Sequence, residues 1–286
     1  MTEPCPGADP DPRPPRQRLP EGSCDCHSHV FGPAERYPYV ANRGYTPPDA
    51  PLAAYRRMLD AMGFTRAVIV QPSVYGTDNR ATMDAVKAMG GAFRAVVVVD
   101  PTISDAALRA LDADGARGVR FNLNNPGGPG IEAMDAVVHR IAPLGWHLQV
   151  FCDLNARPEV VEILKRQPVP VVVDHMGHLR PERGLADEGA KALLGLLADG
   201  RSWVKISGAY RCSSSAIPYR DTTAIARALI DAAPDRTVFG TDWPHPDYRR
   251  PMPNDGDLVD LLLEWVPDAA TRQRVLVDNP ARLYDF

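Results

Sequence analysis

The sequence contains no apolar run of roughly 18 or more residues, the length that a membrane-spanning helix requires. Its first residues lack the basic-then-apolar order of a secretory signal, so we expect a cytoplasmic protein. The five cysteines are an odd number without the paired spacing of a disulfide framework, which favours reduced thiols. Cys24 and Cys26 alternate with polar residues, and we interpret them as small packing residues rather than reactive thiols.

An excess of basic charge is also absent. The formal net charge is −4, and charged residues are spread without long runs, so neither nucleic acid nor a membrane surface is an expected partner. An anionic small molecule would therefore have to be held by local arginines. No Gly-rich phosphate loop, Ser-His-Asp signature or Cys-x-x-Cys pair occurs, which leaves nucleotide hydrolysis and serine-type acyl transfer without support.

The composition is that of a globular protein. Of the 286 residues, 44% are hydrophobic and 24% are charged, which is enough to build a large core. Residues 1–20 are rich in proline and nearly free of large apolar side chains, which predicts a disordered tail. Residues 21–286 are then expected to form a single domain.

Short apolar runs alternate with helical patterns along this domain, as in a parallel sheet with crossover helices. The predicted strands are Gly22–Val30, Arg66–Gln71, Phe93–Asp100, Gly118–Asn122, Trp146–Phe151, Val169–Asp174, Ser202–Ser207 and Thr237–Gly240. The predicted helices are Leu52–Met62, Asn79–Met89, Ser104–Asp112, Glu132–Pro143, Pro158–Arg166, Glu188–Leu197, Thr222–Ala233 and Gly256–Glu264, with a last one after Asp268. Eight strands, each followed by a helix, predict an α/β fold of the (β/α)8 TIM-barrel class. The absence of G-x-G-x-x-G after the first strand argues against a dinucleotide-binding fold.

In such barrels the catalytic groups lie at the carboxyl ends of the strands. His27 and His29 stand there in the first strand, two residues apart, so both imidazoles project from the same strand face. His175 follows the sixth strand and Asp242 the eighth. The predicted catalytic group is therefore His27, His29, His175 and Asp242.

Other interpretations of these residues remain open. His175 could cap a helix, and Asp242 could be a turn or capping aspartate. Two prolines hold His245 in a rigid loop, which leaves its role open. The remaining histidines are expected to be structural or solvated, and these are His139, His147 and His178.

Arginines at the barrel mouth require anionic partners. Arg120 lies on the fourth strand and Arg211 follows the seventh, and either guanidinium could bind a substrate carboxylate or form an internal salt bridge. Ser73 and Tyr75 follow the second strand and could add neutral hydrogen bonds to the substrate.

Several motifs together carry a resemblance to a known family. They are Asp25-Cys26-His27-Ser28-His29-Val30-Phe31-Gly32-Pro33, Gly76-Thr77-Asp78-Asn79, Gly118-Val119-Arg120-Phe121-Asn122, Asp174-His175-Met176-Gly177, Gly240-Thr241-Asp242-Trp243-Pro244-His245-Pro246 and Asn279-Pro280-Ala281-Arg282-Leu283-Tyr284. From about Asp25 to the C-terminus the chain resembles the amidohydrolase superfamily, and within it the 2-pyrone-4,6-dicarboxylate lactonase group.

The resemblance implies hydrolysis of a carboxylated lactone in aromatic-compound degradation. Asp242 would act as general base on water, and the three imidazoles would polarise the lactone carbonyl. Arg120 and Arg211 would hold the substrate carboxylates. The superfamily at large binds one or two divalent metals, whereas the pyrone dicarboxylate lactonases are understood to work without metal, so we expect no cofactor.

Two departures from the family pattern leave the substrate open. Asn124 and Asn125 stand where the pyrone dicarboxylate lactonases carry a Lys-Arg pair, and Phe151 stands where they carry a tyrosine. A muconolactone or 4-sulfomuconolactone is therefore a competing substrate. No lysine or histidine ends the fifth strand, which disfavours a binuclear metal site.

Two further functions stay open. One is a mononuclear zinc amidohydrolase or decarboxylase acting on an aromatic-pathway acid, with zinc held by His27, His29, His175 and Asp242. The other is a silent barrel that only binds small acids or partner proteins. A base converging with three histidines argues against the silent barrel.

Overall fold

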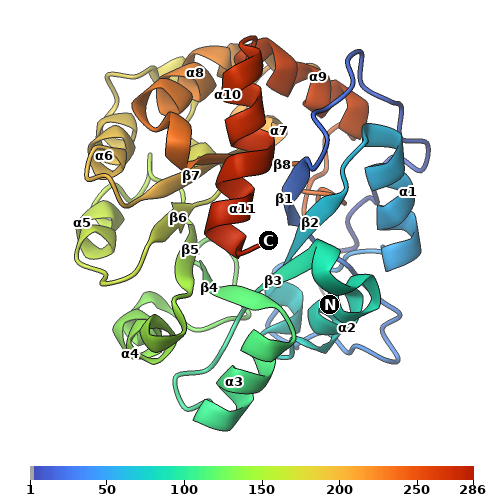
Figure 1. Ribbon diagram of the computed structural model, residues 1–286, viewed down its shortest axis with the longest axis vertical. Coiled ribbons are helices and arrows are strands. Elements are labelled where there is room, and N and C mark those ends of the chain that lie inside the picture. The colour runs from blue at the N-terminus through green and yellow to red at the C-terminus, as the bar shows by residue number, and fades with distance from the viewer. Residues whose placement is uncertain (1–2) are drawn as a thin grey trace.

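The computed structural model describes residues 3–286, and its centre is a single sheet of eight parallel strands that pair in chain order (Figure 1). The strands are β1 (Cys24–Ser28), β2 (Arg66–Val70), β3 (Phe93–Val97), β4 (Ala116–Asn122), β5 (His147–Phe151), β6 (Val171–Val173), β7 (Trp203–Ser207) and β8 (Thr237–Gly240). The predicted (β/α)8 barrel is confirmed, and the predicted bounds of the eighth strand are those of β8.

Helices surround the strands. They are α1 (Leu52–Met62), α2 (Arg80–Met89), α3 (Asp105–Ala113), α4 (Met134–Ile141), α5 (Val160–Lys165), α6 (Glu188–Leu197), α7 (Ala209–Cys212), α8 (Thr223–Ala232), α9 (Asp255–Trp265), α10 (Ala269–Gln273) and α11 (Asn279–Tyr284). The predicted bounds of α1 and α6 match the observed ones. Within residues 3–286, no helix combines the length and apolarity needed to cross a membrane.

The strands bury both of their faces, which is why they are runs of Val, Ile and Ala. On β2, Ala67 and Ile69 pack into the cluster that includes the helices, whereas Val68 and Val70 pack into a smaller inner cluster. Cys24 and Cys26 belong to that inner cluster, which agrees with a packing role. All five cysteines are free and buried.

The barrel closes between β8 and β1 through few backbone bonds. Here the Asp242 N–H donates to the His27 carbonyl at 2.8 Å, and the His29 N–H donates to the Trp243 carbonyl at 2.8 Å. The pairing of β1 with β2 also shifts register between Asp25 and Ser28, so one extra residue bulges on β1. The bulge turns both imidazoles toward the barrel mouth although Cys24 and Cys26 face the interior.

The carboxylate of Asp25 bridges this closure. It accepts hydrogen bonds from the Thr241 N–H at 2.9 Å and hydroxyl at 2.7 Å, and from the Tyr55 hydroxyl of α1 at 2.8 Å. The backbone N–H of His27 donates to it as well, at 3.2 Å. Burial raises the pKa of Asp25 to about 6, against the effect of these donors. One carboxylate therefore ties β1, α1 and the end of β8 together.

Residues 3–20 differ from the disordered tail that composition predicts, and residues 1–2 of that tail lie outside the described part of the chain. The segment packs against the barrel in an extended form, with Cys5 and Leu19 buried. Asn254 holds it, because its side chain accepts from the Arg13 N–H at 3.0 Å and donates to Asp9 Oδ2 at 2.9 Å. A proline-rich chain loses little conformational freedom when such partners order it.

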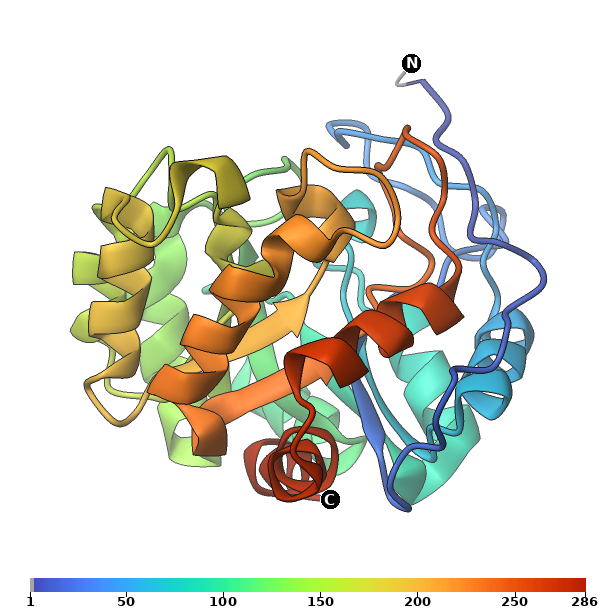
Figure 2. The same cartoon turned by 90° about the horizontal axis from the view of Figure 1, so that it is seen from above.

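The two ends of the barrel are built differently. Helices α10 and α11 cross one end, where Asn279 donates to the Thr237 carbonyl at the start of β8. Figure 2 shows this helix pair at the lower end of the molecule, with the N-terminal segment reaching the upper end. The carboxyl ends of the strands, and with them the predicted site residues, lie opposite α11.

Replacing Asn254 by Ala should lower the free energy of unfolding by about 2 kcal/mol. The variant loses the cap of α9, where Asn254 accepts from the Gly256 N–H, together with the bonds to residues 9–13. Ser104→Ala is the matched control, because Ser104 only caps α3, and should cost about 1 kcal/mol. Equal losses in urea denaturation would contradict a holding role for Asn254.

Candidate active site

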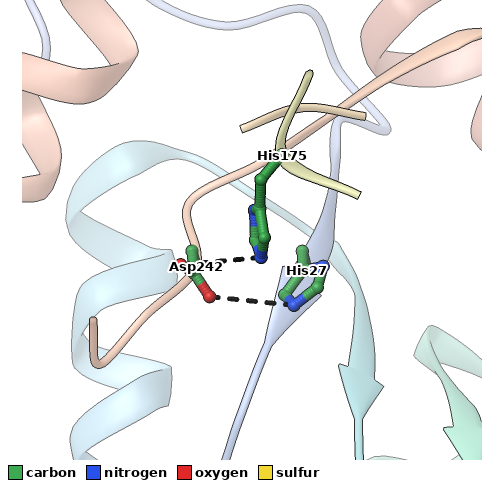
Figure 3. Close-up of side chains that lie close together, drawn as sticks. All are labelled: His27, His175 and Asp242. Carbon is green, nitrogen blue, oxygen red and sulfur yellow. Dashed lines mark ion pairs between the residues drawn. The ribbon is translucent and has the colours of Figure 1, made fainter. Parts of the chain in front are cut away.

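Four side chains predicted from the sequence converge at the barrel mouth. The Nε2 atoms of His27 and His29 lie 3.7 and 3.5 Å from Asp242 Oδ1, and His175 Nε2 lies 3.8 Å from Asp242 Oδ2. Figure 3 shows the imidazoles of His27 and His175, which come from two different segments of the chain, pointing at the Asp242 carboxylate. All four side chains are almost completely buried.

The backbone at this site adopts conformations that few residues tolerate. Asp242 and His175 have positive φ angles of 64° and 49°, which cost roughly 1–3 kcal/mol each outside glycine. Gly240 ends β8 two residues before Asp242, at a point where a Cβ atom would lie 2.5 Å from the Cβ of His27. Only glycine therefore lets β8 approach β1 closely enough to bring Asp242 to the histidines.

Hydrogen bonds at Nδ1, the ring nitrogen that points away from Asp242, orient the imidazoles of His29 and His175. His29 Nδ1 lies 2.6 Å from the Val70 carbonyl, which can only accept, so Nδ1 carries the proton and the neutral ring has a lone pair on Nε2. His175 Nδ1 pairs with the Ser207 hydroxyl at 2.9 Å, and a hydroxyl can donate or accept. Burial lowers the pKa of His27 to about 3 and lowers those of the other two histidines, so all three rings are neutral near pH 7.

The second oxygen of Asp242 is held by two donors. Arg211 Nε lies 2.6 Å and the Tyr210 hydroxyl 2.5 Å from Oδ2. Burial alone would raise the pKa of Asp242, but the Arg211 guanidinium, aided by the imidazoles, lowers it well below its ordinary value. Asp242 is therefore an ionised carboxylate whose Oδ1 atom faces His27 and His29.

Arg120 enters the site from β4. Its Nε lies 3.2 Å from Asp174 Oδ2, and its guanidinium lies 5.4 Å from the centre of the Phe151 ring. Arg120 and Arg211 thus both form internal salt bridges and both line the pocket, and their binding of a substrate carboxylate stays a prediction.

Sequence reasoning missed three polar residues behind the histidines. Lys205 on β7 is fully buried and donates to Gln149 Oε1 at 2.7 Å, while Gln149 Nε2 donates to Asp174 Oδ2 at 2.9 Å. Burial lowers the pKa of Lys205, and Asp174 opposes this shift. Lys205 interrupts the apolar run of Trp203–Ser207, and a lone charge in a buried strand is the signal that could have identified it.

The pocket over this group is narrow. The residues that line it are His29, Tyr45, Arg120, Asn122, Asn125, Phe151, His175, Arg211, Asp242, Pro246 and Asp247. Ser73 and Tyr75 do not belong to this lining, and the Tyr75 hydroxyl instead accepts from the Gly32 N–H at 2.9 Å. Tyr45 comes from the long loop before α1 and carried no signal in the sequence.

His139, His147, His178 and His245 are not among the residues that line the pocket, although the His178 ring packs edge-on against Phe151 with ring centres 4.7 Å apart. His245 Nε2 pairs with Asp255 Oδ1 at 3.3 Å, and its ring packs edge-on against Tyr210, with ring centres 5.2 Å apart. His139 is exposed on α4. His147 is buried against Tyr284 at the other end of the barrel.

The converging donors fit a single divalent metal ion. Ligand atoms of His27, His175 and Asp242 all lie within 4.8 Å of one another, and His29 Nε2 faces the same carboxylate oxygen. His27 Nε2 and Asp242 Oδ1 are buried without a hydrogen-bonding partner among residues 3–286. Three imidazole nitrogens and one carboxylate oxygen are a donor set that suits zinc.

Comparison with known proteins agrees with this geometry. Residues 24–286 match the family model described as amidohydrolase. The chain belongs to the amidohydrolase family. It is therefore an enzyme, and the silent barrel is set aside.

Three relatives illustrate the membership. The chain is 41% identical over 271 residues to a 4-sulfomuconolactone hydrolase of Hydrogenophaga intermedia, covering 93% of this chain and 89% of the relative. It is 40% identical over 286 residues to a 2-pyrone-4,6-dicarboxylate hydrolase of Comamonas testosteroni, covering 96% and 93%. A solved apo structure from Agrobacterium tumefaciens is 33% identical and covers 95% of this chain and 98% of that one, with a TM-score of 0.84.

Buried neutral histidines should make this amidohydrolase acid-sensitive. Burial lowers the pKa of His147 from 6.5 to about 3, so below pH 6.5 the unfolded chain takes up a proton that the folded chain refuses. Stability is therefore lost as pH falls from 6.5 toward 3, by up to about 1.4 kcal/mol per pH unit for this residue.

His147→Phe removes the titration of this one residue. The free energy of unfolding of the variant should therefore fall less steeply with decreasing pH, by up to about 1.4 kcal/mol per pH unit. Denaturant melts of both proteins between pH 5 and pH 7.5 would measure the difference, since roughly this range is where a histidine of ordinary pKa titrates. Parallel curves would show that His147 is protonated in the fold.

Proposed function

We propose that this amidohydrolase hydrolyses a lactone bearing an anionic group, as part of aromatic-compound degradation. The observation that carries the proposal is the placement of two guanidinium groups, those of Arg120 and Arg211, in one pocket with the ionised Asp242. A guanidinium binds a carboxylate or a sulfonate through paired N–H donors. The names of the lactone hydrolases among its relatives support the same reaction class.

The charge balance of the site favours an anion. Among the groups joined by ion pairs, Arg120, Lys205 and Arg211 contribute three positive charges and Asp174 and Asp242 two negative ones. This ion-paired group, to which the pocket-lining Asp247 does not belong, carries one excess positive charge when the imidazoles are neutral. An anionic substrate would neutralise this excess in a site largely shielded from water.

Asp242 is proposed as the general base on water. In the free enzyme Arg211 holds the pKa of Asp242 low, which makes the carboxylate a weak base. A substrate anion on Arg211 would share that positive charge and raise the pKa of Asp242 toward the working pH. Binding would therefore strengthen the base just when a water stands next to the lactone carbonyl.

Oxyanion stabilisation is proposed for His27 and His175. Either ring can carry its proton on Nε2, the nitrogen that faces the pocket, and donate to the carbonyl oxygen. The neutral His29 differs from the expectation that all three imidazoles donate, because its proton is on Nδ1 toward Val70. We assign His29 to accept a hydrogen bond from the attacking water beside Asp242 Oδ1.

The substrate is proposed to carry fewer or differently placed anionic groups than a pyrone dicarboxylate. Asn125 and Phe151 line the pocket where the resemblance would place an arginine and a tyrosine. A neutral amide and an apolar ring offer no charge to a second carboxylate. A muconolactone-type or 4-sulfomuconolactone-type acid is the favoured class, and absorbance assays on a panel of pyrone and muconolactone acids would rank them.

Asp242→Asn should lower kcat roughly 1,000-fold, because an amide cannot accept the proton of water. Substrate binding, measured by calorimetry, should persist, since Arg120 and Arg211 remain. Tyr210→Phe is the matched control, because it removes only the hydroxyl donor to Asp242 Oδ2. It should lower kcat roughly 10-fold. Normal turnover in Asp242→Asn would refute the role of base.

The zinc amidohydrolase is the second candidate, favoured by the three histidines and the carboxylate that face one another. Zinc held there by His27, His29, His175 and Asp242 would lower the pKa of a bound water and polarise the carbonyl. Arg120 and Arg211 would still hold the substrate anion.

Chelation separates the two candidates. Prolonged dialysis against EDTA should leave the rate of lactone ring opening unchanged if the imidazoles and Asp242 catalyse the reaction without a metal ion. Metal content would be measured on the same samples by elemental analysis. Loss of the rate with EDTA, restored by zinc alone, would establish the second candidate.

A further inference from the structure

Lys205 is the one lysine on the strands of the barrel, and it lies beneath the histidines rather than in the pocket. Its side chain is fully buried, and Nζ donates to Gln149 Oε1 at 2.7 Å and to the Cys26 carbonyl at 2.9 Å. Nζ also lies 3.3 Å from His27 Nδ1 and 3.5 Å from Asp174 Oδ1. These four contacts join β1, β5, β7 and the residue that follows β6 around one ammonium group.

Counting donors shows where the third N–H of the ammonium points. An ammonium group has three donors, and two are used on the acceptor-only oxygens of Gln149 and Cys26. The contact from Nζ to His27 Nδ1 has hydrogen-bond geometry, whereas Asp174 Oδ1 has no hydrogen-bonding partner among residues 3–286. The third donor has hydrogen-bond geometry to His27 Nδ1, which can accept it only when that nitrogen carries no proton.

We propose that Lys205 is a positioning residue that holds His27 in the tautomer with its proton on Nε2. In this tautomer His27 donates a hydrogen bond to the carbonyl oxygen of the lactone, and Nε2 has no lone pair for a metal ion. The proposal rests on the proposed lactone hydrolysis for its kinetic consequence, but the tautomer itself can be measured without substrate.

Asp174 is the competing group, because a carboxylate at His27 Nδ1 would impose the opposite tautomer. Its Oδ1 atom lies 3.3 Å from Nδ1. The hydrogen bonds that Asp174 accepts are on its other oxygen, from Arg120 Nε at 3.2 Å and Gln149 Nε2 at 2.9 Å. We therefore assign Asp174 to hold Arg120 for the substrate anion, and Lys205 to hold His27.

The tautomer decides which chemistry the site supports. With the proton on Nε2, His27 accepts a hydrogen bond from the Lys205 ammonium at Nδ1 and donates one from Nε2. The ammonium thereby strengthens the donation from Nε2 to the carbonyl oxygen on which negative charge develops. With the proton on Nδ1, the same ring becomes a metal ligand backed by a carboxylate, as is usual in zinc sites. Lys205 thus biases the barrel toward hydrolysis by hydrogen bonding, and its positive charge opposes a divalent ion at His27.

The direct test is nitrogen-15 NMR of the whole protein with labelled histidine, in which protonated and unprotonated ring nitrogens are resolved. The His27 signals are identified by their loss in His27→Gln. The wild type should show the proton on Nε2, Lys205→Met should shift it to Nδ1 toward Asp174, and Asp174→Asn should leave it on Nε2. Wild-type His27 protonated on Nδ1, or no change in Lys205→Met, would overturn the proposal.

Zinc binding and kinetics give independent readouts. Lys205→Met should gain stoichiometric zinc by elemental analysis after incubation with zinc sulfate, whereas the wild type and Asp174→Asn should not. Without zinc, kcat should fall about 100-fold in Lys205→Met with little change in KM. Asp174→Asn should mainly raise KM, because it frees Arg120.

Thermal melts show whether each variant folds. If Lys205→Met does not fold, Lys205→Gln, which keeps a polar side chain, is used in its place. Equal zinc content in wild type and variant would contradict the proposal. If no lactone in the panel is hydrolysed, the proposed function fails while the tautomer and zinc results still decide the role of Lys205.

Discussion

The closure of the barrel between β8 and β1 is the constraint on which the site depends. Among residues 3–286, the hydrogen bonds across this closure are two backbone bonds at the strand ends and those to the carboxylate of Asp25, and His27, His29 and Asp242 lie at these strand ends. The pairs β2–β3, β4–β5 and β7–β8 by contrast have regular ladders. A closure made of few bonds leaves space between the strand ends for side chains, and Gly240 keeps that space narrow enough for the groups to meet.

Charge compensation inside the barrel is the second organising feature. Two of the buried carboxylates have cationic partners that reach them from a different strand or loop, Arg120 and Lys205 for Asp174 and Arg211 for Asp242. Buried ions are costly unless they are paired, so the network must form together with the barrel. The arginines consequently serve both the folded state and the proposed capture of an anion.

Most of the fold, and the outline of the site, could be predicted from the sequence. Apolar runs such as Val171–Val173 gave eight strands, and strand-end placement led to His175 and Asp242. The bulge at β1 could not be predicted, because one extra residue leaves the Cys-Asp-Cys-His pattern unchanged. Lys205 and Gln149 were missed since their contact depends on register across the barrel, and the packing of residues 3–20 depends on Asn254, which is remote in sequence.

The bulge in β1 has a consequence for how such a site can change. Side chains alternate along a strand, so if the same residues paired with β2 in a regular ladder, without the bulge between Asp25 and Ser28, the residues after Asp25 would point the opposite way. The imidazoles would then face the helical layer, with every catalytic side chain still encoded. The chemistry of this barrel is thus specified by how its first strand pairs with the second as well as by the identity of its residues, and a one-residue change of that pairing would remove the imidazoles from the site with the sequence unchanged.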